Sequence, residues 1–177
     1  MMKQINLIFF ALLFFNVHAQ RSPVQLTGDI LQIGLPVVAL ASTCYYPSDD
    51  KPHWQFVKSF ATAMLITHSI KHIINKERPD GGDYSFPSGH TTSAFSAATF
   101  LHIRYGWKVG VPALALASFV GYSRIYAQRH DVWDVMAGAG VGIGSALLFT
   151  KPFRSNNLNV YINKSESYYL VGLNYRF

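Results

Sequence analysis

Residues 123–150 read SRIYAQRHDVWDVMAGAGVGIGSALLFT, a polar stretch followed by an apolar stretch of helical length. His130 and Asp134 are four residues apart at the start of the apolar part, so the two side chains share one face of a helix. The carboxylate can then accept a hydrogen bond from one imidazole nitrogen and leave the other free to attack an electrophile. Arg124 stands just before the pair and is placed to neutralise negative charge on the group that the imidazole attacks. In isolation, a surface His–Asp pair that caps a helix is the simpler interpretation.

Four more apolar segments of helical length precede this stretch, with short polar breaks between them. The breaks at 47–50 and 78–83, PSDD and RPDGGD, are rich in turn-forming residues. The five predicted helices are 29–46, 54–75, 88–104, 108–123 and 131–150. We therefore expect an all-α fold, a bundle of about five core helices that forms a single domain over residues 20–150.

The two ends of the chain depart from this helical pattern. Residues 1–19 combine Lys3, an apolar run and small residues at the usual cleavage positions, which predicts a signal peptide cleaved before Gln20. An uncleaved first membrane span is the alternative, although the run is shorter than the ~20 residues that a span prefers. Residues 151–177 are polar and alternate like strands, which predicts a short C-terminal β-hairpin-like tail.

The composition is typical of one apolar domain, because half of the chain is hydrophobic and only 14% is charged. Two uncharged runs, 30–46 and 109–122, and the alternate glycines from Gly138 to Gly144 favour helices that cross a membrane and pack closely. A soluble or peripheral periplasmic bundle is the alternative, because the mean hydropathy is only +0.16 and helix 88–104 would rise ~25 Å against ~30 Å of hydrocarbon. The net charge of +6 is scattered along the chain, so we expect no nucleic-acid partner.

A membrane topology follows when the five predicted helices are threaded through a bilayer from an outer start. The basic residues at the inner ends are then Lys51, Arg104, Lys108, Lys151 and Arg154. This agrees with the positive-inside rule. Six polar residues gather at the outer ends: Lys71, Arg78, Ser88, His90, Arg124 and His130. We therefore expect a protein of the cytoplasmic membrane whose active site faces the periplasm, while the strand-like tail leaves an outer-membrane association open.

Two other polar clusters lie at predicted helix ends. Lys71 and Arg78 are seven residues apart, or two helical turns, so both are expected to point to one side and to hold a dianion such as phosphate. Residues 87–90, PSGH, are typical of a helix start, with Ser88 as the N-cap and free backbone amides that favour phosphate binding. Alone, each cluster has a simpler interpretation: a basic membrane surface for the first, and ordinary capping beside an incidental His90 for the second.

The three clusters together are far more specific than any one of them. The sequence closely resembles the phosphatidic acid phosphatase type 2 superfamily, whose signature is Lys-x6-Arg-Pro, then Pro-Ser-Gly-His, then Ser-Arg-x5-His-x3-Asp. Residues 71–79, 87–90 and 123–134 meet this signature in full. The resemblance covers about residues 54–150 and also implies an all-helical core.

The resemblance implies a phosphate pocket formed by Lys71, Arg78, Ser88, Gly89 and Arg124. It implies that His130 forms a phosphohistidine, that His90 protonates the leaving group, and that Asp134 orients His130. The expected enzyme is a phosphatase that needs no metal and no cofactor. Its expected substrate is a phosphate ester or pyrophosphate, above all of a lipid at the membrane.

Other functions remain open at this stage. Two alternatives are enzymes: a soluble periplasmic non-specific acid phosphatase, and a vanadium haloperoxidase-like enzyme with the same anion pocket. A third alternative is a membrane protein that has no catalytic activity. The sequence predicts neither which phosphorylated lipid is used nor the oligomeric state. His68 and His72 flank Lys71 but have no place in the signature, so we interpret them as neighbours of the site or interfacial residues. The single cysteine, Cys44, is interpreted as a buried small apolar residue.

Overall fold

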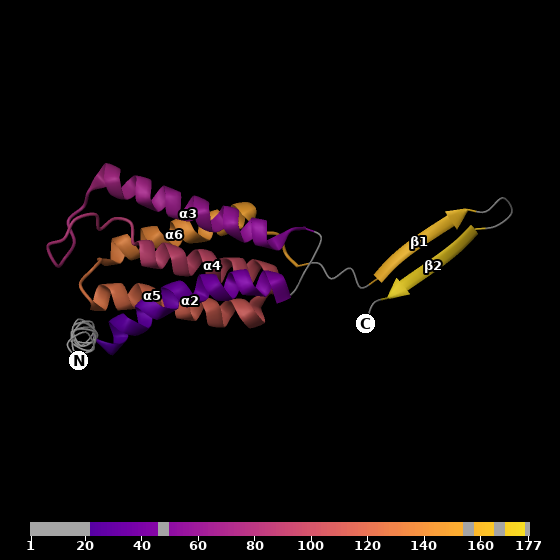
Figure 1. The fold of residues 1–177 in the computed structure, drawn as a ribbon, viewed down its shortest axis with the longest axis horizontal. Coiled ribbons are helices and arrows are strands. Elements are labelled where there is room, and N and C mark those ends of the chain that lie inside the picture. The colour runs from indigo at the N-terminus through magenta and orange to yellow at the C-terminus, as the bar shows by residue number, and fades with distance from the viewer. Residues whose placement is uncertain (1–21, 46–49, 154–157, 165–168, 176–177) are drawn as a thin grey trace, which may run out of the picture.

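The computed structural model describes residues 22–45, 50–153, 158–164 and 169–175 of the chain. Its described helices are α2 (Pro23–Tyr45), α3 (Pro52–Ile74), α4 (Gly89–Tyr105), α5 (Trp107–Tyr126) and α6 (Val132–Phe149), and they lie side by side in one bundle (Figure 1). The predicted all-α bundle of about five helices is confirmed. The predicted signal peptide, residues 1–19, lies outside the described residues.

The observed helices agree with the predicted ones to within a few residues, except at the start of α2. This helix begins at Pro23 rather than at residue 29. Proline suits a first helical turn, because an N–H there would have no partner within the helix. Ser22 caps this turn, since its Oγ accepts a hydrogen bond from the N–H of Gln25 at 3.2 Å. The Ser-Pro pair is therefore a helix start that the apolar pattern did not reveal.

The centre of the bundle is α4, which contacts each of the other four described helices. Its fully enclosed side chains are mostly small, among them Ala94, Ala97 and Ala98. α6 comes very close to its backbone: a β-carbon on Gly138 would lie 2.5 Å from the backbone oxygen of Ser88, and one on Gly142 would lie 2.7 Å from that of Thr92. Because only glycine permits this approach, the glycines of α6 fix the position of the first turns of α4.

Three of the described helices, α2, α5 and α6, are long and apolar enough to cross a membrane. Many of their large apolar side chains face outwards; for example, Ile30 and Leu148 are 60% and 76% exposed. Exposed aromatic side chains also lie near both ends of the bundle, namely Tyr45, Trp54 and Trp107 at one end and Tyr84, Tyr126 and Trp133 at the other. An apolar band between aromatic ends is typical of a transmembrane protein.

The prediction for the single cysteine is wrong, because Cys44 is exposed. α2 turns Gly28, Leu35, Ala39 and Thr43 towards the bundle. Consecutive residues of a helix point about 100° apart, so Cys44 points away from the buried face that Thr43 occupies.

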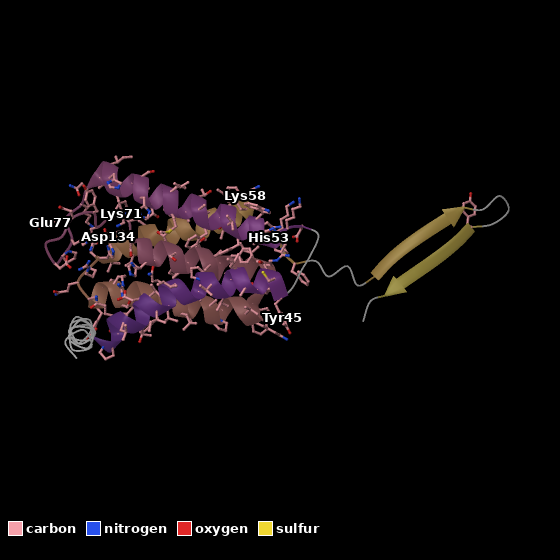
Figure 2. All side chains as sticks on the ribbon, viewed as in Figure 1. Tyr45, His53, Lys58, Lys71, Glu77 and Asp134 are labelled. Carbon is pink, nitrogen blue, oxygen red and sulfur yellow. The ribbon has the colours of Figure 1, made fainter. Side chains whose placement is uncertain are left out.

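A buried arginine closes the end of the bundle at which α2 and α4 finish. Arg104 is 2% exposed and donates through both terminal nitrogens to the carboxylate of Asp50, with distances of 3.0 Å. It also donates to the backbone oxygen of Lys151 at 3.3 Å. Figure 2 shows Tyr45 and His53 at this end and Lys71 and Asp134 at the opposite one. The signature residues are thus separated from this structural ion pair by the length of the bundle.

The C-terminal tail forms the predicted hairpin. Strands β1 (Leu158–Lys164) and β2 (Tyr169–Tyr175) pair antiparallel, with Leu158 opposite Tyr175 and Lys164 opposite Tyr169. The hairpin contacts none of the described helices, and Figure 1 shows it away from the bundle. The hairpin therefore contributes nothing to the described helical core, whereas the first tail residues contact it: Lys151 bonds to Gln55 and Arg104, and Phe153 bonds to Arg104.

We expect Gly142→Ala to destabilise the bundle by about 1–3 kcal/mol, because the new β-carbon would overlap backbone atoms of Thr92 and Ser96. Gly140→Ala on the same helix is the matched control, since a β-carbon there meets nothing within 4 Å. The control should be as stable as the parent or more so by up to about 1 kcal/mol, because alanine favours helices. Thermal unfolding in detergent measures both. Equal melting temperatures for the two variants would contradict the close α4–α6 contact.

Candidate active site

A cavity of about 670 Å³ lies at the end of the bundle where α3 and α5 finish and α4 and α6 begin. Six of the eight predicted site residues line it: Lys71, Arg78, Gly89, His90, Arg124 and His130. The other two, Ser88 and Asp134, are fully buried. The side chains of Lys71 and Asp134 lie at the same end of the bundle in Figure 2. The chain thus brings the three sequence clusters together at one place.

The two cations of the first cluster reach the cavity, but not by the predicted route. α3 ends at Ile74 and Asn75 adopts a left-handed conformation with φ 41°, so Arg78 stands in the following loop and not on the helix of Lys71. Lys71 Nζ donates to the backbone oxygen of Tyr84 at 2.6 Å, which holds the ammonium group beside this loop. Arg78 Nε is buried, and the described residues provide no hydrogen-bond acceptor for it. An anion in the cavity would satisfy this donor.

The PSGH segment begins α4 as predicted, although Ser88 does not cap the helix with its side chain. Its hydroxyl oxygen instead accepts from Thr91 Oγ1 at 2.9 Å, which leaves the hydroxyl hydrogen to donate elsewhere. The backbone N–H of Ser88 donates to the backbone oxygen of Asp134 at 2.9 Å and ties α4 to α6. Gly89 and His90 form the first turn, where uncovered amides and the helix dipole favour an anion.

The imidazole of His130 is almost enclosed, with 5% of the residue exposed. Its Nδ1 lies 3.6 Å from Asp134 Oδ2 and 3.3 Å from the hydroxyl oxygen of Ser85. The predicted pairing of His130 with Asp134 is therefore present, but the nearer neighbour of Nδ1 is Ser85. Sequence reasoning missed Ser85, because nothing in the local pattern distinguishes it from other loop serines.

Asp134 is held by donors from two loops. Lys76 Nζ donates to its Oδ1 at 2.8 Å, and the backbone N–H of Asp131 donates to its Oδ2 at 3.0 Å. Asp131 in turn caps α6 and pairs with Lys76. Burial lowers the pKa of Lys76, but its hydrogen bonds to the two carboxylates outweigh this effect and raise the pKa above the ordinary value. Lys76 is therefore positively charged at neutral pH and forms ion pairs with the carboxylates of Asp131 and Asp134. It is a second residue that sequence reasoning missed.

α2 supplies an acidic side chain that sequence reasoning also missed. Asp29 Oδ1 accepts a hydrogen bond from Arg124 Nη1 at 2.7 Å and lies 3.2 Å from His90 Nε2. The helix can approach this closely because Gly28 has no side chain, and a β-carbon there would lie 2.0 Å from Ser123 Oγ. Asp29 is the one charged residue of α2, and a lone charge in an apolar helix of this length was the signal that could have revealed it.

The environment of His130 keeps its imidazole neutral. Burial lowers the pKa of His130 to about 4, and the nearby charges of Lys71 and Arg78 act in the same direction against the carboxylate of Asp134. The side chain therefore has a free lone pair at neutral pH. No group of three or more His, Cys, Asp and Glu side chains within the described parts of the chain is arranged to hold a metal ion. The expected independence of a metal stays a prediction.

Residues 52–157 match the family described as the PAP2 superfamily. The chain belongs to the PAP2 superfamily. The match begins at the first residue of α3, extends beyond α6 and includes all three clusters. The resemblance inferred from the sequence is thus confirmed.

Several relatives of this PAP2 protein are named as phosphatases. The lipid A 4'-phosphatase of Helicobacter pylori is 28% identical over 99% of this chain and 100% of the relative. A lipid A 1-phosphatase of the same organism is 37% identical and covers 81% of this chain and 74% of the relative. The crystal structure of a transmembrane PAP2 type phosphatidylglycerolphosphate phosphatase from Bacillus subtilis has a TM-score of 0.58 and 26% identity, with 74% of this chain and 77% of that chain covered. This PAP2 protein is accordingly a phosphatase and a membrane protein.

We expect the imidazole of His130 to stay neutral until the pH falls towards about 4, because burial and the neighbouring cations disfavour its charged form. Nuclear magnetic resonance of histidine-labelled protein in detergent, with His130→Gln for assignment, measures this titration. A His130 signal that titrates near the ordinary value of about 6.5 would contradict the account of its environment.

Proposed function

We propose that this PAP2 protein hydrolyses a phosphate ester or pyrophosphate of a membrane lipid, without a metal, through a phosphohistidine on His130. The observation that carries the proposal is that the three cations and both imidazoles of the family signature converge on one cavity, which Arg129 and His68 also line. The cations are Lys71, Arg78 and Arg124, and the imidazoles are those of His90 and His130. Cations bind a phosphate dianion, and imidazoles can attack phosphorus and transfer protons.

The pocket has the groups needed to hold a phosphate in place. Arg78 offers a buried donor without an acceptor among the described residues, and Lys71 adds a second positive charge. Ser88 retains a hydroxyl hydrogen, and the first turn of α4 at Gly89 presents backbone amides at the positive end of a helix dipole. These donors are fixed before the substrate arrives, so they can stabilise the charge that develops on the transferring phosphoryl group.

In the proposed first step, Nε2 of neutral His130 attacks phosphorus, because Nδ1 faces Ser85 and Asp134. A P–N bond forms as the P–O bond to the leaving group breaks, and His90, in the imidazolium form that the Asp29 carboxylate and the bound phosphate favour, donates a proton to the departing oxygen and becomes neutral. In the second step His90 takes a proton from water, the water oxygen attacks phosphorus, and the P–N bond breaks to release phosphate. The carboxylate of Asp134 stabilises the positive charge on His130 throughout.

Two features support a lipid as the substrate. The cavity of about 670 Å³ is much larger than one phosphate group and continues along α2 and α3 to Gln32, Ile33, Met64 and His68. The exposed apolar surfaces of α2, α5 and α6 also favour access from a bilayer and argue against a soluble acid phosphatase or haloperoxidase-like enzyme. His68, expected beside the site, thus lines the space that a headgroup would fill. Lipid A phosphates are the first substrates to test, because relatives are named for them.

We also propose that residues 20–150 form the phosphatase domain of a cytoplasmic-membrane protein and that its cavity faces the periplasm. Residues 1–19 are the proposed signal peptide. Positive charges that favour the cytoplasm lie at the end opposite the cavity, at Lys51, Arg104, Lys108 and Lys151. A cysteine-labelling experiment on intact and opened cells distinguishes this orientation from its reverse.

Removal of His130 and removal of His90 should affect kcat in different ways. His130→Ala should lower kcat by on the order of 10⁴-fold or more with every substrate, because no other residue of the signature has the role of accepting the phosphoryl group. His90→Ala should lower kcat by about 10²–10⁴-fold on an alkyl phosphate, whose leaving oxygen needs a proton. With p-nitrophenyl phosphate the leaving group is stable without a proton, so His90→Ala should recover much of its rate and His130→Ala should not. A His90→Ala enzyme that is equally slow on both substrates would show that the assigned roles are wrong.

Turnover of a lipid phosphate should continue in excess EDTA and should be inhibited by vanadate, because the proposed pocket binds the phosphoryl group with cations and amides. Phosphate release after exhaustive dialysis against EDTA measures this. Loss of activity that a divalent ion restores would overturn the metal-independent mechanism.

A further inference from the structure

Ser85 lies outside the three clusters of the family signature, and its side chain is fully buried between His130 and Asp134. Its hydroxyl donates a hydrogen bond to Asp134 Oδ2. Its oxygen is 3.3 Å from Nδ1 of His130, whereas the carboxylate oxygen is 3.6 Å from the same nitrogen. The longer distance exceeds an ordinary hydrogen bond. The serine hydroxyl, and not the carboxylate, is therefore the nearer partner of the imidazole.

The direction of these hydrogen bonds follows from the number of donors. Asp134 is surrounded by donors, with Lys76 Nζ on Oδ1 and the N–H of Asp131 on Oδ2, so it acts as a carboxylate that only accepts. The single hydrogen of the Ser85 hydroxyl then points to Asp134. Only lone pairs of Ser85 remain to face His130, so Nδ1 must carry the hydrogen of that contact. This selects the neutral tautomer whose lone pair is on Nε2.

We propose that Ser85 is a positioning residue that connects Asp134 to His130 through its hydroxyl. The Nδ1–H of His130 donates to Ser85 Oγ, and the hydroxyl of Ser85 donates to Asp134. When positive charge develops on the imidazole during phosphoryl transfer, this chain stabilises it while the proton stays on Nδ1. The inference rests on the proposed role of His130 as the nucleophile.

The backbone of Ser85 is fixed on both sides, which gives its hydroxyl a defined position. Its N–H donates to the backbone oxygen of Lys76 at 2.7 Å, and its own backbone oxygen accepts from Lys71 Nζ at 3.2 Å. Lys76 therefore holds both Ser85 and Asp134, and Lys71 connects Ser85 to the wall of the phosphate pocket. A hydroxyl held in this way needs little reorganisation during the reaction.

Ser85→Ala tests the connection, and Ser96→Ala is the matched control. Ser96 is also fully buried, but it bonds to Ser59 Oγ at 3.3 Å between α3 and α4, away from the cavity lining. We expect Ser85→Ala to lower kcat by about 10- to 100-fold, the usual effect of losing a group that orients a reactive side chain. Inhibition by vanadate should be unchanged, because the cations of the pocket remain. The control should keep its kcat.

Two further measurements separate positioning from simple loss of structure. In the double variant Ser85→Ala/Asp134→Asn, kcat should be close to that of Asp134→Asn alone, because both changes break one chain. Nitrogen-15 shifts of His130 should show a hydrogen on Nδ1 in the parent protein and a mixture of tautomers in Ser85→Ala. Ser85→Cys keeps the shape with a weak donor and acceptor, and should resemble Ser85→Ala in kcat.

The outcomes distinguish this inference from the proposed function. If His130→Ala is inactive while Ser85→Ala matches Ser96→Ala in kcat, the Ser85 inference fails and the role of His130 stands. A fall in kcat accompanied by equal weakening of vanadate inhibition would assign Ser85 a structural role and also overturn the inference. A parent protein whose His130 carries its hydrogen on Nε2 would overturn it without any variant. Full turnover by His130→Ala would instead overturn the proposed function.

Discussion

The whole site depends on one buried carboxylate, that of Asp134. Its oxygens accept hydrogen bonds from Lys76, Ser85 and the backbone of Asp131, and its backbone oxygen accepts from the N–H of Ser88. A carboxylate without water is stable only when donors surround it, so these contacts are required for folding as well as for chemistry. Through them one residue fixes the loop after α3, the loop before α6 and the first turn of α4. The phosphate pocket lies between these three segments.

Close helix packing makes this arrangement possible. α4 passes through the centre of the bundle, and α6 approaches its backbone at Gly138 and Gly142, where side chains of any size would collide with α4. The amide end of α4 is thereby held against the segment that carries His130 and Asp134. On the other side, Gly28 lets α2 bring Asp29 within hydrogen-bond distance of Arg124. Glycines in the helices therefore allow close packing, and this packing holds the charged side chains in fixed positions around the cavity.

The sequence predicted the fold and most of the cavity lining because helix periodicity and motif spacing are local signals. The five helices follow from apolar runs, and the three clusters fall at helix ends that one topology brings together. Sequence-based prediction was wrong or incomplete where tertiary contacts determine the position of a side chain. Arg78 reaches the cavity from a loop rather than from the helix of Lys71. Ser85 contacts His130 from a loop whose sequence has no distinctive pattern. Asp29 was missed because its partners stand more than sixty residues away in the chain. The lone charge of Asp29 in the apolar helix α2 is the sequence signal that points to this residue.

The central claim is that His130 carries the phosphoryl group between substrate and water, and trapping that intermediate tests it most directly. Turnover of a lipid phosphate labelled in its phosphoryl group can be quenched in alkali, in which phosphohistidine survives, and the digested protein analysed by mass spectrometry. The account predicts a phosphorylated peptide with the modification on His130, absent from His130→Ala. A phosphoryl group on any other residue, or active turnover of labelled substrate with no phosphoenzyme at any quench time, would contradict it.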